Sequence, residues 1–456
     1  MQVARKLYGW TYQRLFSPAW ERWVRHRRPT LDYLAILEET QWLSRQEIQL
    51  LQLQNLKQLL SYAKDHVPYY RQLFAKVGLE PNEVRSAADL VALPPLTREL
   101  IRERYADLVS PEHLGRTIKK GTSGSTGVPL KFEYNLDSEA WRIAVRIRGY
   151  RWSGYQPGLP VFYYWAQAAP LAGALGRKIT LDRALKREIY HDSMKQDEAS
   201  MLDAVSAIRS HKPRVIVCYV QSCALLSRFI LERGLRDWDD IPVLCGAEPL
   251  LPADRAVIAK AFGPHVYETY GSRETMLIAS ECSRHEGMHL QEENILTEIA
   301  LDGRPVAAGE IGDVLVTDLH NYGMPLIRYQ NGDTAVMMKD APCGCGRELG
   351  RLARVDGRRA DTMSDRNGKP IPGIVFHVLF ADARQELINQ FQAVQKPTGN
   401  VHLKIVRGPL FTDAAFKTVV GRFDQYLGGL PLSVEFCEKI SPGKNGKFKS
   451  IVVERA

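Results

Sequence analysis

"RVIVCYVQSCALLSRFILERG", residues 214–234, joins a β-branched run to a helical pattern that stops at glycine. The same alternation continues on both sides, with helical patterns at 201–213 and 253–263 and strand patterns at 241–248 and 265–271. Strands separated by helices predict parallel βαβ units, which bind ligands at the carboxyl ends of their strands. The segments "GAE" (246–248) and "YGSRE" (270–274) stand at such ends.

The flanking regions have different patterns. Apolar residues recur three and four apart from about 31 to 110, which predicts helices, and short strands with turns from about 289 to 340 predict an antiparallel, barrel-like subdomain. The residues after 357 form a further mixed unit. We therefore expect an α/β protein with a large domain over 1–356, whose residues 1–110 are a mostly helical lead-in, and a small α+β domain over 357–456.

Composition narrows the class of protein. The chain has 456 residues, 45% of them hydrophobic and 25% charged, which predicts several globular domains. We find no apolar run of the roughly 18 residues that a membrane helix needs. The seven cysteines are odd in number and sparse, which favours reduced thiols or a metal site and a cytoplasmic location. The net charge of +9 would attract nucleic acid, anionic lipid, or nucleotides and coenzyme A alike.

Residues 4–28, "ARKLYGWTYQRLFSPAWERWVRHRR", alternate basic and aromatic side chains. Such a helix could lie on an anionic membrane surface. It could equally pack on the main domain with its arginines in water, and the sequence leaves both interpretations open.

The segment "TSGSTGVP" (122–129) concentrates glycine and hydroxyl side chains. Free backbone N–H groups and hydroxyls suit phosphate, although the loop lacks the lysine of a Walker motif. By itself it could also be a flexible surface loop.

Two further segments, "ECSRHEGMHL" (281–290) and "APCGCGRE" (341–348), supply metal-ligating side chains. The candidates are Cys282, His285, His289, Cys343 and Cys345. Three thiols with one imidazole would form a closed structural zinc site, whereas unligated cysteines in a turn are the alternative.

Six motifs occur in one order along the chain: "TSGSTGVP", "GAEPL" (246–250), "TYGSRE" (269–274), "NGD" (331–333), "GR" (357–358) and "NGKFK" (445–449). In order and spacing they resemble the adenylate-forming superfamily, and within it the phenylacetate–coenzyme A ligase branch that includes the CapK proteins. The resemblance covers nearly the whole chain.

This resemblance implies a site for ATP, Mg²⁺ and probable coenzyme A, and a mobile C-terminal domain. It assigns binding of the phosphates to Thr122, Ser123, Gly124, Ser125, Thr126 and Gly127, and binding of adenine to Gly246, Ala247, Glu248, Tyr270 and Gly271. The ribose is assigned to Asp333 and Arg358. Glu274 would bind magnesium in a catalytic role, and the positively charged side chain of Lys447 would be the catalytic lysine. Without the resemblance, Tyr270 could be core, Asp333 and Arg358 could be turn residues, and Lys447 could be part of a solvated basic tail.

The resemblance also selects Cys282, His289, Cys343 and Cys345 as zinc ligands. The chain departs from the family in three places. Leu130 precedes Lys131 where relatives have a lysine directly after the proline, Ala360 replaces a hinge aspartate with Asp361 next to it, and Arg273 replaces a smaller polar residue. Residues 161–176 could line the acid pocket or be an ordinary buried strand.

The expected function is activation of a carboxylic acid as an acyl-adenylate, with release of pyrophosphate, followed by transfer to a thiol, probably coenzyme A. An alternative keeps the adenylate and passes the acyl group to an amine or hydroxyl in capsule, surface-polysaccharide or secondary-metabolite synthesis. A lower-ranked alternative is a zinc-containing nucleic-acid-binding protein. We expect no nucleic-acid partner, and the sequence does not identify the acid or the oligomeric state.

Overall fold

The computed structural model of the chain describes residues 8, 11–19, 29–121, 130–165, 173–193, 195, 197–358, 363–366, 370–371, 387–421, 423, 427, 429–441 and 450–454. Among these residues, none of the helices combines the length and the apolar character needed to cross a membrane. The described part of the basic N-terminal segment contacts the main domain. Tyr12, in the short helix η1 (Tyr12–Phe16), is buried against Gly158, and Tyr8 donates a hydrogen bond to the Leu185 carbonyl oxygen at 2.8 Å.

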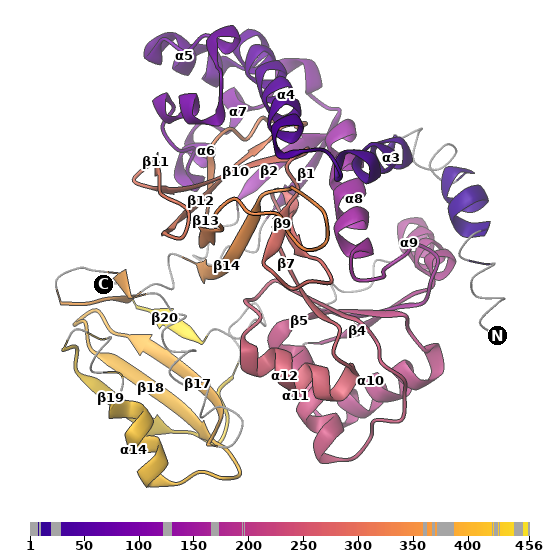
Figure 1. Cartoon of the computed structure of the whole chain (residues 1–456), viewed down its shortest axis with the longest axis vertical. Coiled ribbons are helices and arrows are strands. Elements are labelled where there is room, and N and C mark those ends of the chain that lie inside the picture. Colours follow the sequence, from indigo (N-terminus) through magenta and orange to yellow (C-terminus); the bar gives the residue numbers. More distant parts are fainter. Residues whose placement is uncertain are drawn as a thin grey trace.

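The segment 31–110 folds into helices that cover one end of the molecule (Figure 1). They are α3 (Thr30–Thr40), α4 (Arg45–His66), α5 (Pro68–Val77), α6 (Arg98–Glu103) and α7 (Tyr105–Leu108), with single turns at η2 (Pro81–Glu83), η3 (Ala87–Ala92) and η4 (Pro111–His113). The apolar repeat runs on from α3 to α4, yet the helix is interrupted. Glu47 accepts the Ser44 backbone N–H at 2.8 Å in a capping box that starts a new helix.

A 12-stranded sheet forms the centre of the large domain, in the order β11-β10-β12-β13-β14-β9-β8-β7-β6-β5-β3-β4. The parallel strands are β3 (Val161–Trp165), β4 (Glu188–Asp192), β5 (Val215–Tyr219), β6 (Val243–Gly246) and β7 (Val266–Ser272). The antiparallel strands are β8 (Met276–Glu281), β9 (Met288–Leu290), β10 (Ile295–Leu301), β11 (Arg304–Pro305), β12 (Ile311–Asp318), β13 (Tyr329–Met337) and β14 (Arg351–Arg358).

The antiparallel strands, expected as a barrel-like subdomain, continue the parallel strands edge to edge through the β7–β8 pair. They share one core with the N-terminal helices, in which Leu60 and Tyr70 pack with Ile299 and Val314. The lead-in helices and the antiparallel strands are therefore one packed unit.

Helices cover both faces of the parallel strands (Figure 1). They are α8 (Leu136–Arg151), α9 (Gly173–Lys186), α10 (Glu198–His211), α11 (Val220–Glu232) and α12 (Pro252–Phe262). Side chains alternate across β3, so Phe162 joins the core beneath α10, α11 and α12 while Tyr163 joins the core beneath α3 and α8. The carboxyl ends of these strands lead into the predicted ligand motifs.

The C-terminal residues form a separate small sheet beside β14 (Figure 1). Its order is β19-β18-β17-β20, built from β17 (Ile388–Gln395), β18 (Val401–Arg407), β19 (Leu432–Phe436) and β20 (Ile451–Val453), with helix α14 (Asp413–Gly421) and the short pair β15 (Met363–Ser364) and β16 (Pro370–Ile371). Phe391, Leu403 and Phe416 belong to its own core. Arg358 still pairs with Asp333 of the large sheet, and the exact domain boundary stays a prediction.

Candidate active site

A two-stranded hairpin holds the ends of the Gly/Ser/Thr loop. Strands β1 (Thr117–Gly121) and β2 (Lys131–Asn135) are antiparallel, and Gly121 is the register partner of Lys131. Arg273 donates a hydrogen bond to the Gly121 carbonyl oxygen at 2.8 Å, so the loop begins beside the turn that follows β7. The predicted phosphate-binding residues Thr122, Ser123, Gly124, Ser125, Thr126 and Gly127 lie outside the described residues.

The predicted adenine segment leaves the carboxyl end of β6. A Cβ on Gly246 would lie 2.8 Å from Thr269 Oγ1, so the close approach of β7 requires glycine here. Ala247 has a left-handed φ of +67°, which turns the chain out of the sheet. Glu248 then accepts the backbone N–H of Gln221 at 2.9 Å, in the first turn of α11. A carboxylate is favourable at a helix N-terminus, so this contact fixes the segment.

Tyr270 joins the two halves of the sheet. Its hydroxyl donates to Asp333 Oδ2 at 2.9 Å and accepts from Asn331 Nδ2 at 2.7 Å, and all three side chains are buried. Asn331 Oδ1 also accepts the Asp333 backbone N–H at 2.9 Å. The orientation of Asp333 is therefore set by two neighbours. Asn331 stands in the "NGD" motif, but sequence reasoning gave it no role.

Asp333 lies opposite Arg358 in the pairing of β13 with β14, which brings together the two residues predicted at the ribose. The side chain of Arg358 is not among those described. Its neighbour Gly357 has a φ of +96°, and a Cβ there would lie 4.0 Å from Pro249 Cγ. The "GR" motif thus approaches the adenine segment. Ala360, Asp361 and Lys447 lie outside the described residues.

The turn after β7 positions Glu274. A Cβ on Gly271 would lie 1.9 Å from the Met276 carbonyl oxygen, so only glycine permits this tight return of the chain. Glu274 is 2% exposed, and its Oε1 accepts hydrogen bonds from Arg98 Nη2 at 2.9 Å and from the Tyr329 hydroxyl at 2.8 Å. No sequence motif pointed to Arg98 or Tyr329, because their approach depends on the tertiary fold.

Aromatic side chains line the strand ends next to the adenine segment. Trp165, the last residue of β3, packs on Tyr219 at the end of β5, with ring centroids 3.9 Å apart. Burial is the main cause that raises the pKa of Tyr219 to about 12; the nearby Glu248 carboxylate contributes to this shift and Arg273 opposes it. Residues 166–172 of the predicted acid pocket lie outside the described residues.

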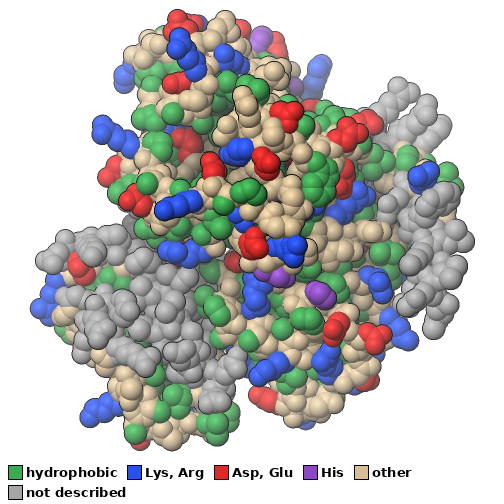
Figure 2. All heavy atoms as spheres, in the orientation of Figure 1, with side chains coloured by type: hydrophobic (Ala, Val, Ile, Leu, Met, Phe, Trp, Pro, Cys, Tyr) green, Lys and Arg blue, Asp and Glu red, His purple; other side chains and the backbone are tan. Residues whose placement is uncertain are grey.

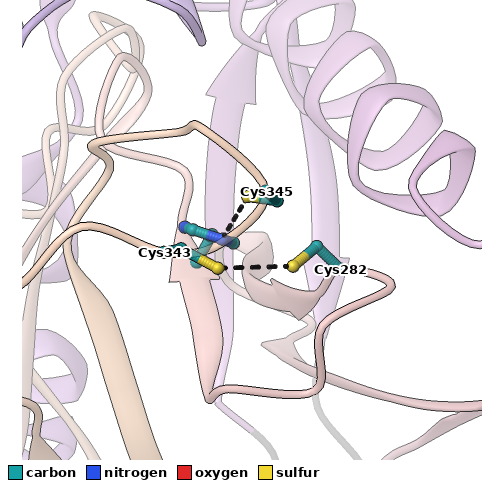
Figure 3. A group of neighbouring side chains, drawn as sticks. Cys282, Cys343 and Cys345 are labelled. Carbon is teal, nitrogen blue, oxygen red and sulfur yellow. Dashed lines mark hydrogen bonds between the residues drawn. The ribbon is translucent and has the colours of Figure 1, made fainter.

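Four predicted metal ligands converge on one point between β8, β9 and the loop before β14. The ligand atoms of Cys282, His289, Cys343 and Cys345 all lie within 4.8 Å of one another. The Cys282 and Cys343 sulfur atoms are 3.7 Å apart and face each other, with Cys345 beside them (Figure 3). Cys345 Sγ lies 3.3 Å from His289 Nε2. The side chains of Cys282, His289 and Cys343 are buried.

The imidazole of His289 is held in the form that a metal requires. Its Nδ1 lies 3.4 Å from the Leu349 carbonyl oxygen, which accepts the Nδ1 proton and leaves the Nε2 lone pair facing the thiols. Burial lowers the pKa of His289 to about 4, so the ring is neutral at pH 7. The alternative ligand His285 instead contacts Glu281 Oε2 at 3.2 Å and packs on Tyr267, outside the cluster.

Comparison with known proteins gives a consistent result, although no family model matches the chain. A phenylacetate–coenzyme A ligase of Thermus thermophilus is 27% identical, over 82% of this chain and 85% of the relative. The protein CapK of Staphylococcus aureus is 24% identical, over 78% of both chains. The crystal structure of a 2-hydroxyisobutyryl-CoA ligase in complex with R3-HIB-AMP superposes on this chain with a TM-score of 0.73. The two sequences are 20% identical, and the match covers 92% of each chain. The predicted fold class is confirmed.

Proposed function

We propose that the chain is a member of the adenylate-forming superfamily, and within it an AMP-forming ligase that joins a carboxylic acid to coenzyme A. The observation that carries the proposal is the buried contact of Tyr270 with Asn331 and Asp333. This contact joins an aromatic ring to a carboxylate on the strand that pairs with the "GR" strand. Arg98 links Asn331 to Glu274, and Arg273 links the turn after β7 to the hairpin of the Gly/Ser/Thr loop. The phenylacetate–coenzyme A ligases among its relatives support the same activity.

The first half-reaction transfers AMP. An oxygen of the acid's carboxylate attacks the α-phosphorus of ATP, the bond to the bridging oxygen breaks, and pyrophosphate leaves. The loop 122–127 would surround the β- and γ-phosphates, Asp333 would accept hydrogen bonds from both ribose hydroxyls, and Lys447 would neutralise charge where two anions meet. These roles follow from motif position and stay proposals.

In the second half-reaction the thiol sulfur of coenzyme A attacks the acyl carbon and loses its proton to solvent, the bond from that carbon to the phosphate oxygen breaks, and AMP leaves. We place this transfer after a rotation of the C-terminal domain, with Asp361 as a candidate hinge in place of Ala360. ATP and coenzyme A are cytoplasmic metabolites, so the proposed location is the cytoplasm. Peripheral contact of the basic N-terminal segment with an anionic membrane stays a secondary proposal.

Glu274 suits Mg²⁺, because this cation commonly binds one or two carboxylates together with substrate phosphates. When bound, magnesium would neutralise charge on the triphosphate. Glu274 would hold it at the turn that also contacts the start of the phosphate loop through Arg273.

We propose that Cys282, His289, Cys343 and Cys345 hold a structural Zn²⁺. A tetrahedral site with Zn–S bonds of about 2.3 Å has sulfur atoms about 3.8 Å apart, close to the 3.7 Å between Cys282 and Cys343. Four protein ligands leave no open position, so the metal would tie β8 and β9 to the loop before β14 rather than take part in the reaction.

The acceptor defines a second candidate. The likeness to CapK favours transfer to an amine or hydroxyl of a surface-glycan precursor as the alternative to coenzyme A. A nucleic-acid-binding role ranks below both, because basic and acidic side chains are interspersed over the face in Figure 2, whereas nucleic acid calls for a basic stripe.

The test is exchange of labelled pyrophosphate into ATP, without coenzyme A, across aromatic, short-chain, fatty and hydroxy acids. We expect exchange with one class of acid, its loss in Lys447→Ala, and its retention in the neighbouring control Lys444→Ala. Adding coenzyme A, or an amine or hydroxyl acceptor, then identifies the product. Unchanged exchange in Lys447→Ala would refute the catalytic role of that lysine.

A further inference from the structure

Arg98 brings a positive charge from the helical lead-in to the carboxylate of Glu274. Its Nη2 donates to Glu274 Oε1 at 2.9 Å and to the Asn331 carbonyl oxygen at 3.2 Å. The side chain of Arg98 is 15% exposed and that of Glu274 is 2% exposed. A buried carboxylate needs a compensating charge, and Arg98 supplies it.

The backbone fixes the position of Arg98 relative to β13. Leu96 forms a parallel bridge with Tyr329, in which the Leu96 N–H donates to the Arg328 carbonyl oxygen and the Gln330 N–H donates to the Leu96 carbonyl oxygen, both at 3.0 Å. Thr97 then caps α6, because its Oγ1 accepts the Leu100 N–H at 3.2 Å. The backbone on either side of Arg98 is therefore held by hydrogen bonds, and the fold itself brings Arg98 to Glu274.

The two oxygens of Glu274 have different surroundings. Oε1 accepts from both Arg98 and Tyr329, whereas Oε2 has no hydrogen-bond partner within the part of the chain that the structure describes. This is the pattern of a metal-ligating carboxylate, in which outer neighbours hold one oxygen and leave the other for the cation.

We propose that Arg98 is a positioning residue for a divalent cation at Glu274. With Tyr329 it fixes Oε1 and compensates the carboxylate charge, so that Oε2 is held ready as the cation ligand. Arg98 also joins the cation to the nucleoside site, because Asn331 accepts from Arg98 and donates to the Tyr270 hydroxyl. The inference rests on the proposed function in taking Glu274 as the carboxylate that meets the metal–nucleotide complex.

The test measures cation binding directly, by electron paramagnetic resonance of Mn²⁺ titrated into the full-length protein with a non-hydrolysable ATP analogue. Loss of an outer-shell partner typically weakens metal affinity by about 10- to 100-fold, so we expect at least a tenfold weaker Mn²⁺ affinity in Arg98→Met. Arg98→Lys should recover part of it, and Tyr329→Phe should lose less. The control is Arg102→Met, which removes a guanidinium from the same helix, where it pairs with Glu99.

A mutant cycle separates positioning from a general structural role. In a Glu274→Gln background, already weak in Mn²⁺ binding, Arg98→Met should weaken it no further. An additional tenfold loss there, or wild-type affinity in Arg98→Met alone, would overturn the proposal. If Arg98→Met does not fold, the Arg98→Lys and Tyr329→Phe proteins carry the same comparison. If Arg98→Met weakens Mn²⁺ binding as expected but the wild-type protein shows no pyrophosphate exchange with any acid, the proposed function would be refuted and the assignment of Arg98 would stand.

Discussion

Replacing Glu268 by glutamine should remove a pH dependence from the stability of the large domain. Glu268 lies on β7 beneath the adenine segment, where its Oε1 accepts the Leu250 backbone N–H at 3.1 Å. Burial raises the pKa of Glu268 from 4.5 to about 7. The Leu250 hydrogen bond opposes this shift, the Glu281 carboxylate adds to it and Arg255 opposes it. The folded protein thus favours the protonated form of this side chain.

The sign and size follow from proton linkage. Because the folded-state pKa of Glu268 lies above the unfolded value, the contribution of its protonated form to the unfolding free energy is fully present below about pH 4.5. This contribution is lost as the pH rises through 7. Each tenfold change in proton affinity is worth about 1.4 kcal/mol, so a pKa of about 7 corresponds to a loss of about 3 kcal/mol. Solvent at the partly exposed side chain reduces the expected loss to about 2 kcal/mol between pH 5 and pH 8.

The assay is urea unfolding of wild-type and Glu268→Gln protein at pH 5, 6, 7 and 8, followed by tryptophan fluorescence. Glutamine keeps the acceptor for Leu250 but cannot ionise, so the variant should gain stability relative to wild type as the pH rises. Groups common to both proteins cancel in the difference. A difference in unfolding free energy that stays constant from pH 5 to pH 8 would show that Glu268 does not titrate in this range, and the reasoning from its burial would be wrong.

Three further changes test the site. Tyr270→Phe keeps the ring but removes the donor to the proposed ribose carboxylate, a loss of about 1.5 kcal/mol, so ATP should bind about tenfold more weakly by calorimetry; unchanged affinity would contradict this. Gly271→Ala places a Cβ against the Met276 carbonyl oxygen and should lower the unfolding free energy by about 2 kcal/mol or more, whereas the control Gly421→Ala, with open space around it, should not. Cys343→Ser should reduce zinc from about one ion per chain to none by metal analysis; wild-type protein purified without chelator and free of zinc would refute the site.

Much of the fold could be predicted from local patterns. The alternation around 214–234 gave β5 and α11 within a residue or two, because the hydrophobic period and the glycine stop are local signals. The helical pattern from about 31 to 110 did not locate the break between α3 and α4, because the apolar repeat continues across it and the Ser44 capping box starts the new helix. The extension of the parallel strands by the antiparallel ones depends on the β7–β8 pairing, which strand pattern alone does not determine.

In the candidate site, too, local sequence signals could be recognised, whereas contacts that depend on the tertiary fold could not. Cys282, His289, Cys343 and Cys345 were found because cysteine and histidine are rare and their spacing carries information. Residue types alone could not choose between His289 and His285, and the choice came from family resemblance. The structure gives the physical reason, because His285 contacts Glu281 while His289 meets the thiols.

The residues missed by sequence reasoning explain why the long helical lead-in is part of the site. Arg98 stands 176 positions before Glu274 in the chain, and nothing in "LTRE" distinguishes it from an ordinary helix start. Its role arises because Leu96 is hydrogen-bonded to β13, the strand that also carries Asp333. A displacement of the lead-in helices would therefore move the Arg98 guanidinium, and with it the hydrogen bonds that it donates to Glu274 and to the Asn331 carbonyl oxygen. The helices that share a core with β10 and β12 thus set the electrostatics of the proposed phosphate site as well as supporting the sheet.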